Sequence, residues 1–161
     1  MDPASGLAAT KAAVDAAQLA YKGWGWLTRR WYGTITITHP QNRGVVYPEW
    51  VELEGTHNNP KRGHFWLFTV RGQEYWPQTR INLHPDGHWK ERINASAQPG
   101  PRTCVVLLVW VSTFVDSLLS DIKDRSSRAQ YWGPIKMSPP SRRFSVVQSL
   151  VLSVETRPTA R

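Results

Sequence analysis

The sequence is poor in cysteine, in long apolar runs and in targeting signals. Cys104 is the only cysteine among 161 residues, so no disulfide can form within one chain and a disulfide-stapled secreted scaffold is excluded. The longest apolar run, CVVLLVWV, has the length of a strand and falls short of the roughly 18 residues of a membrane-spanning helix. Residues 1–22 lack the basic start and apolar core of a secretory signal. We therefore expect a protein of the reducing cytoplasm.

Recognisable catalytic and cofactor motifs are missing as well. The sequence contains no G-x-S-x-G, no P-loop and no G-x-G-x-x-G, and the short stretch GWGW does not join a strand to a helix. Cys104 lies in an apolar, strand-like run, where a thiol is normally buried and inert. His84 and His88 are two imidazoles without a further ligand at a recognisable spacing. We therefore expect no enzyme activity, no cofactor and no metal site.

Tryptophan and positive charge are plentiful. Nine tryptophans and a hydrophobic content of 40% indicate a packed globule. Twenty Lys and Arg residues against 12 Asp and Glu residues give a formal net charge of +8, and the excess is spread along the chain. This balance favours polyanions, acidic proteins or anionic membranes as partners, and it is equally typical of an ordinary basic surface.

Residues 1–33 are expected to form an N-terminal helix and a connector rich in Trp and Arg. Asp2 and Pro3 suit a helix cap and a first helical position, and the alanine-rich stretch up to Gly23 predicts a helix over 3–22. The connector combines indole rings with guanidinium groups, which suits a protein hot spot, a stacked base or a membrane interface. Its candidate protein-contact residues are Trp24, Trp26, Arg29, Arg30 and Trp31. Alternatively, the rings fill the seam between this helix and the domain body.

From Thr34 onward the sequence alternates with a period of two, which predicts half-buried strands. Short strands separated by Gly, Pro and Asn turns indicate a mainly β protein, an antiparallel β-sandwich of about seven strands over 34–156, followed by a flexible tail at 157–161. The strands are expected at 34–38, 50–55, 65–70, 75–79, 80–83, 88–95, 103–111 and 144–154.

The segment from His84 to His88 contains Pro-Asp-Gly, the residues of a tight turn. Proline presets the first turn position, and glycine supplies the positive φ that closes the turn. We therefore expect His84 and His88 to face each other across a hairpin, with Trp76 and Trp89 as packing residues.

A second helix is predicted between the last two strands, over 113–125. Thr113, followed three residues later by Asp116, suits a capped N-terminus. The apolar residues expected on its buried side are Phe114, Val115, Leu118, Leu119 and Ile122. Because the strands at 65–70 and 103–111 are apolar on both faces, the outer face of their sheet must be covered by this helix, by the N-terminal helix or by a second copy.

The stretches ITITHPQNRGVVYPEWVELEGTH, HFWLFTVRGQEYWPQ and DGHWKERI resemble a family of bacterial immunoglobulin-like β-sandwich domains. The resemblance covers about residues 34–155 and includes the helix before the final strand. It implies that Gly44 and Gly55 lie in turns, that Trp66 lies in the core and that Pro77 lies at a sheet edge. It also implies a binding or accessory module of bacterial surface, signalling and defence proteins, without shared catalytic residues.

The favoured function is a non-catalytic recognition or assembly module that binds a protein partner or a second copy of itself, in a bacterial signalling or defence complex. The alternative is binding of an anionic ligand, a nucleotide or nucleic acid, through two basic loops that share one end of the sandwich. Its candidate residues are Lys61, Arg62, Arg142 and Arg143. Peripheral membrane association through the N-terminal segment is a second alternative, disfavoured by an alanine-rich helix that carries Asp15.

Overall fold

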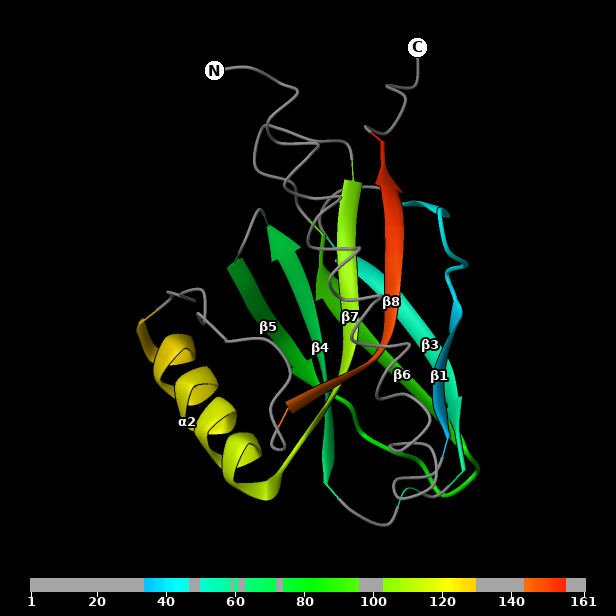
Figure 1. The fold of residues 1–161 in the computed structure, drawn as a ribbon. Coiled ribbons are helices and arrows are strands. Elements are labelled where there is room, and N and C mark those ends of the chain that lie inside the picture. The colour runs from blue at the N-terminus through cyan, green and yellow to red at the C-terminus, as the bar shows by residue number, and fades with distance from the viewer. Residues whose placement is uncertain are drawn as a thin grey trace.

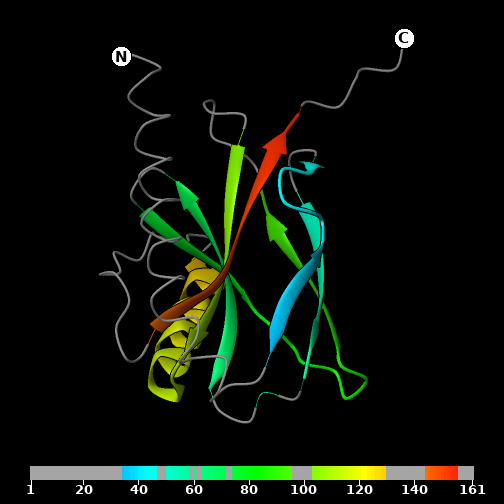
Figure 2. The same ribbon diagram turned by 45° about the vertical axis from the view of Figure 1, so that its right-hand side comes forward.

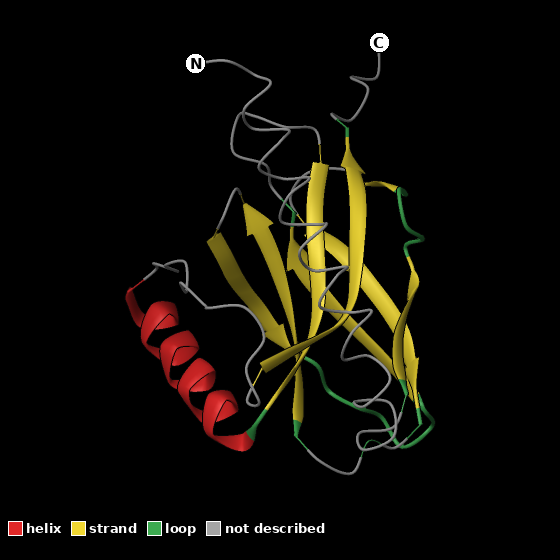
Figure 3. Ribbon diagram, in the orientation of Figure 1, coloured by secondary structure: helices red, strands yellow, loops and turns green. Residues whose placement is uncertain are grey.

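The computed structural model describes residues 34–46, 50–58, 60, 63–71, 74–95, 103–129 and 144–155. Strands dominate this part of the chain, and one helix precedes the last strand (Figures 1 and 3). The elements are β1 (Ile35–His39), β2 (Val45–Val46), β3 (Trp50–His57), β4 (His64–Arg71), β5 (Glu74–Arg80), β6 (His88–Asn94), β7 (Thr103–Val111), α2 (Thr113–Ala129) and β8 (Phe144–Val154). The mainly β class and the helix before the final strand are confirmed. The helix predicted over 3–22 lies outside the described residues.

The described strands form two sheets that face each other (Figure 2). The smaller sheet has the order β1-β3-β6 and is antiparallel throughout. The larger sheet has the order β2-β8-β7-β4-β5, in which β2 runs parallel to β8 and the other pairs are antiparallel. The prediction of a wholly antiparallel sandwich is therefore wrong at one place, because the two-residue strand β2 joins the larger sheet in parallel beside the last strand.

The strand predicted at 80–83 is absent. Arg80 ends β5, and the backbone N–H of Ile81 donates to the carbonyl of Phe65. The chain then crosses from the larger sheet to the smaller one, where β6 begins at His88. A connection between two sheets cannot continue a ladder in either, so the short alternation in this segment does not produce a strand.

A hydrophobic core fills the space between the sheets. Strand alternation places Val51 and Leu53 of β3 inside this core, whereas Trp50 lies on the opposite side of the strand. Cys104 is buried there too, as predicted. The inward residues of β4, β7 and β8 in this core are Phe65, Leu67, Val106, Leu108, Trp110, Leu150, Leu152 and Val154.

A second core lies on the outer face of the larger sheet, between the sheet and α2 (Figure 1). Its residues include Trp66, Phe68, Val70, Val105, Leu107, Val109, Val111, Leu119 and Phe144, with Val115 packed against them. The prediction that a helix covers this face is confirmed for α2. Phe114 and Leu118 were predicted on the buried side but are exposed. Each precedes by one residue a position that packs against the sheet, the partly buried Val115 or the buried Leu119, and is therefore rotated about 100° around the helix.

Two glutamines connect the sheets where strand registers shift. The β4–β5 register shifts between Leu67 and Phe68, which leaves Gln78 as an extra residue, and its Oε1 accepts from the backbone N–H of Asn94 in β6 at 3.1 Å. Near the shift between β7 and β8, Oε1 of Gln148 accepts from the backbone N–H of Ile37 in β1 at 2.8 Å. Side-chain amides thus bond the backbone at one point on each outer strand of the smaller sheet.

The predicted Pro-Asp-Gly turn is confirmed. Gly87 has a φ of 86°, and the backbone N–H of His84 donates to the carbonyl of His88 at 3.1 Å. Trp89 is buried in the core between the sheets, as expected, while Trp76 on the edge strand β5 is only half-buried. Gly44 lies in a turn, where its N–H donates to the carbonyl of Gln41, but Gly55 lies inside β3 and not in a turn.

Candidate functional site

The outer face of the smaller sheet carries a regular array of polar side chains around an exposed indole. Alternate residues of β1, β3 and β6 point away from the core, and we call this surface the outer sheet face. Its members are Thr36, Thr38, Trp50, Glu52, Glu54, Thr56, His88, Lys90 and Arg92. Trp50, at one end of β3, exposes 66% of its surface and has the largest exposed fraction among the large hydrophobic residues in the described part of the chain.

Charged side chains of β3 and β6 pair across the strands of this face. The register sets Glu52 opposite Arg92 and Glu54 opposite Lys90. The ammonium of Lys90 lies 2.6 Å from Oε1 of Glu52 and 2.8 Å from Oε1 of Glu54, and Nε of Arg92 lies 3.6 Å from Oε2 of Glu52. The hydrogen bond with Lys90 lowers the pKa of Glu52, and the bonds to Glu52 and Glu54 raise the pKa of Lys90. The array is therefore a charge-balanced ladder.

An open hollow of about 420 Å³ lies at the other end of the outer sheet face. Its lining residues are Thr38, Glu54, Gly55, Thr56, His84, His88, Trp89 and Lys90. Asp86 fixes the turn between the two histidines, because its Oδ1 accepts from the backbone N–H of His88 at 3.0 Å. This bond and the nearby rings of His88 and His84 lower the pKa of Asp86. The turn thus presents both imidazoles at the rim of the hollow.

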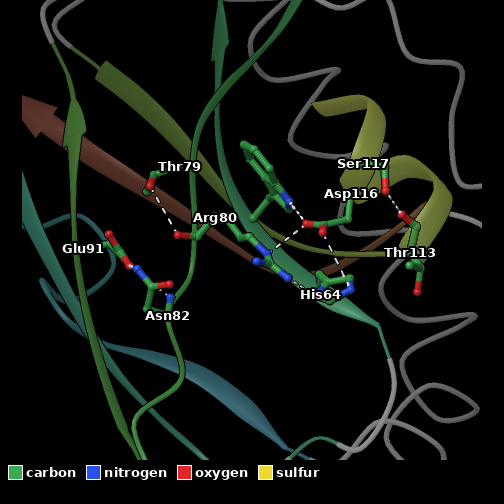
Figure 4. A network of polar contacts seen from close by, with 9 residues as sticks. His64, Thr79, Arg80, Asn82, Glu91, Thr113, Asp116 and Ser117 are labelled. Atoms are coloured by element: carbon green, nitrogen blue, oxygen red, sulfur yellow. Dashed lines mark hydrogen bonds and ion pairs between the residues drawn. The ribbon is translucent and has the colours of Figure 1, made fainter. Parts of the chain in front are cut away.

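A buried carboxylate forms a second polar cluster, where α2 meets the larger sheet (Figure 4). Oδ1 of Asp116 accepts from the indole N–H of Trp66 at 2.8 Å and from Nε of Arg80 at 3.0 Å. Oδ2 of Asp116 lies 3.7 Å from Nε2 of His64. Arg80 also donates through Nη2 to Nδ1 of His64. One carboxylate therefore joins α2 to β4 and β5.

The Asp116 cluster is built as a structural link and not as a helix cap. Capping of α2 falls to Ser112, whose Oγ accepts from the backbone N–H of Val115 at 3.4 Å. The predicted cap pair of Thr113 and Asp116 is therefore wrong, because Asp116 turns inward to the indole N–H of Trp66. Both donors to Oδ1 are held by the sheet, so the carboxylate has no side open to a substrate at that oxygen.

The residues predicted for binding lie outside the described part of the structure. These are the protein-contact candidates Trp24, Trp26, Arg29, Arg30 and Trp31 and the anion-binding candidates Lys61, Arg62, Arg142 and Arg143. The strands that follow the basic pairs are described. His64 at the start of β4 pairs with Val111 at the end of β7, and Val111 pairs with Phe144 at the start of β8. These two strands therefore begin at the same end of the larger sheet.

The sequence contained a signal for the outer sheet face that the prediction of site residues did not use. Alternation places Trp50 on the same side of β3 as Glu52 and Glu54, and an indole on a charged side cannot belong to the core. A second missed surface is the exposed side of α2, where Phe114 exposes 65% of its surface and Leu118 exposes 50%.

Within the described residues, no three His, Cys, Asp or Glu side chains are grouped as metal ligands. No helix in this part of the chain is long and apolar enough to cross a membrane.

Comparison with known proteins assigns no family. No family model matches the chain, and no curated protein matches it significantly. A chain in a structure of T-cell specificity and activation by the bacterial superantigen toxic shock syndrome toxin-1 is 10% identical, with a TM-score of 0.41, over 76% of this chain and 99% of that one. A crystallised engineered protein is 6% identical, with a TM-score of 0.44, over 76% of this chain. The match spans only 20% of the length of that engineered protein. These likenesses are distant, and the chain is a mainly β protein without an assigned family.

Proposed function

We propose that the chain is a non-catalytic recognition module that binds a protein partner through the exposed side of α2. The observation that carries the proposal is the pair Phe114 and Leu118, which lie one turn apart and expose 65% and 50% of their surface. The neighbouring residues Val115 and Leu119 pack against the larger sheet and hold the helix in place. An apolar pair on a firmly packed helix is a typical protein contact, because burying it costs little conformational entropy.

The proposal includes an immunoglobulin-like sandwich, which the strand order supports. Immunoglobulin sandwiches combine a sheet with strands A, B and E and a sheet with strands G, F and C, extended by C′ in variable domains. When the two-residue strand β2 is left out, β1, β3, β4, β5, β6, β7 and β8 correspond in chain order to A, B, C, C′, E, F and G. The smaller sheet β1-β3-β6 is then A-B-E, and the larger sheet β8-β7-β4-β5 is G-F-C-C′. Cys104, the single cysteine of the sequence, lies on the strand corresponding to F, and Trp66 on the strand corresponding to C packs toward α2. The resemblance to bacterial immunoglobulin-like domains supports a role in a signalling or defence complex.

The partner is expected to be acidic around an apolar anchor. The chain has a net charge of +8, and complementary charge speeds association while apolar contact supplies most of the affinity. The N-terminus of α2 follows Val111, at the end of the sheet where β4 and β8 begin. The exposed or partly exposed charges between Asp121 and Arg125 of α2, two acidic and two basic, balance each other, so the expectation of carboxylates on the partner rests on the net charge of the whole chain.

Site-specific photocrosslinking tests the proposal. A benzophenone amino acid at position 114 or 118 should capture one partner in cells, and Phe114→Ala with Leu118→Ala should weaken its binding at least tenfold, because anchor truncations cost about 1–2 kcal/mol each. The matched controls are Trp50, 66% exposed, for the crosslinker and Val45, 52% exposed, for the alanine substitution. Capture at position 50 alone, or equal weakening by Val45→Ala, would refute the α2 contact.

A second candidate function, binding of an anionic ligand, is favoured by the strand register. Lys61 and Arg62 precede His64 by three and two residues, and Arg142 and Arg143 directly precede Phe144. The strands that follow the two basic pairs in the sequence, β4 and β8, begin at the same end of the larger sheet, beside the end of β7.

Salt dependence of binding to a fluorescent single-stranded DNA tests this candidate. Four phosphate contacts predict a slope of log affinity against log salt near −3, at about 0.7 per contact. Replacing all four basic residues by Gln should remove most of this slope. The control with an equal charge change is Arg43→Gln, Arg92→Gln, Lys123→Gln and Arg125→Gln. Equal losses for the two quadruple variants would mean attraction by net charge without a site.

A further inference from the structure

We infer that the outer sheet face binds a neutral, hydroxyl-rich chain, an oligosaccharide that runs along β3. This face and α2 lie on opposite sides of the larger sheet (Figures 1 and 2), so the two surfaces do not overlap. The inference therefore goes beyond the protein contact proposed above, and either can fail without the other.

Trp50 supplies the aromatic platform. Its indole exposes 66% of its surface, while its backbone is held in register opposite Asn94 of β6. The C–H groups on one side of a sugar ring are apolar and slightly positive, so they stack on the electron-rich face of an indole. A ring mounted on a paired strand is already placed for such stacking. A protein hot spot would instead be expected to have an apolar surround, whereas the next outward residues are Glu52 and Arg92.

The charge balance of the face selects for a neutral ligand. Glu52 and Glu54 carry two negative charges, and Lys90 and Arg92 carry two positive charges that pair with them. A phosphate on this face would lie beside carboxylates, and a cation would lie beside the ammonium and guanidinium groups. Hydroxyl groups both donate and accept, so they can bond to either kind of charged group, and such charge-assisted bonds are stronger than neutral ones.

The hollow extends the surface to the length of several sugar rings. It is lined by two threonine hydroxyls, two imidazoles and the Glu54–Lys90 pair, all of which can bond to hydroxyl groups. Trp50 and Glu54 are four residues apart on β3, which corresponds to about 13 Å. A ligand that stacks on Trp50 and reaches the hollow is therefore an extended chain and not a single sugar.

Titration with three neutral hexasaccharides tests the inference. Cellohexaose, chitohexaose and maltohexaose would each be added to ¹⁵N-labelled protein, with the indole N–H signal of Trp50 identified by its loss in Trp50→Phe. We expect at least one to shift this signal with a Kd at or below about 1 mM, the range of weak reversible binding. Trp50→Ala should weaken that binding more than tenfold. Because no counterions are released, the Kd should change less than about twofold when NaCl rises from 50 to 500 mM.

Control variants separate the site from general effects. Lys90→Met and Thr56→Val, at the hollow, should weaken binding of the same hexasaccharide severalfold, while Phe114→Ala on α2 should leave it unchanged. These three positions and position 50 are all at least partly exposed, so the variants are expected to fold. The inference is overturned if none of the three hexasaccharides shifts the Trp50 signal, if binding survives Trp50→Ala, or if affinity falls steeply with salt.

Discussion

Gly55→Ala is expected to lower the free energy of unfolding by about 3 kcal/mol or more, at the upper end of the cost of overpacking a core. A Cβ at this position would lie 2.0 Å from the carbonyl oxygen of Thr36 and 2.3 Å from Cε2 of Trp89. Neither neighbour can move easily, because the first is backbone of the paired strand β1 and the second is a core residue that is 1% exposed. Urea denaturation followed by circular dichroism measures the loss.

Gly87→Ala is the matched control for this prediction. Gly87 has a φ of 86°, but a Cβ there would meet only the carbonyl oxygen of His57, at 3.3 Å. It therefore tests mainly backbone strain, with one close contact that a small shift relieves, and a loss of about 1–2 kcal/mol is expected. If both alanine variants lose the same stability, close packing of β1, β3 and Trp89 around Gly55 is not what requires glycine.

Asp116→Ala is expected to cost about 2–4 kcal/mol of unfolding free energy. The substitution leaves the indole N–H of Trp66, a residue that is 0% exposed, without its acceptor, and an unsatisfied buried donor costs about 1–3 kcal/mol. It also removes the ion pair with Arg80, whose contribution is limited because the Arg80 side chain is 43% exposed and can be solvated. Asp116→Asn should cost less, because the amide oxygen can still accept from Trp66.

The control lies on the same helix. Asp121 pairs with Arg125 at 2.7 Å, but both side chains are more than half exposed, so Asp121→Ala should cost less than about 0.5 kcal/mol. The indole N–H signal of Trp66 should shift in the Asp116 variants and stay in place in Asp121→Ala. A loss for Asp116→Ala no larger than that for Asp121→Ala would contradict the role of Asp116 as the link between α2 and the sheet.

The elements with a clear local signal, whether alternation, an apolar run or a turn motif, were predictable from sequence. The strands around Val51 and Leu53, the long apolar strand that holds Cys104 and the Pro-Asp-Gly turn follow from local periodicity and turn chemistry. The need for a cover on the outer face of the larger sheet, by a helix or by a second copy, also followed, because β4 and β7 are apolar on both sides. In each case the information lies within one short segment.

What the sequence did not reveal depends on contacts between distant segments. The role of Asp116 is set by Trp66, fifty positions earlier in the chain, and β2 exists because its two residues meet the end of β8. Helical periodicity grouped Phe114 with Leu119, and only the packing direction of α2 shows that one is exposed and the other buried. Alternation placed Trp50 on the charged side of β3, but the polar array around it forms only because β1 and β6 flank β3.

The two glutamines at the sheet junctions have a consequence for how the protein behaves in concentrated solution. An outer strand with unpaired amides is a template for the strand of another molecule, and proteins that leave such strands bare tend to aggregate. In the smaller sheet, Gln148 accepts a hydrogen bond from the backbone N–H of Ile37 in the outer strand β1. Gln78 accepts one from the backbone N–H of Asn94 in the other outer strand, β6. Each outer strand of the smaller sheet therefore has one backbone N–H that is already bonded within the molecule, by an uncharged side chain, and that position cannot pair with the strand of another molecule.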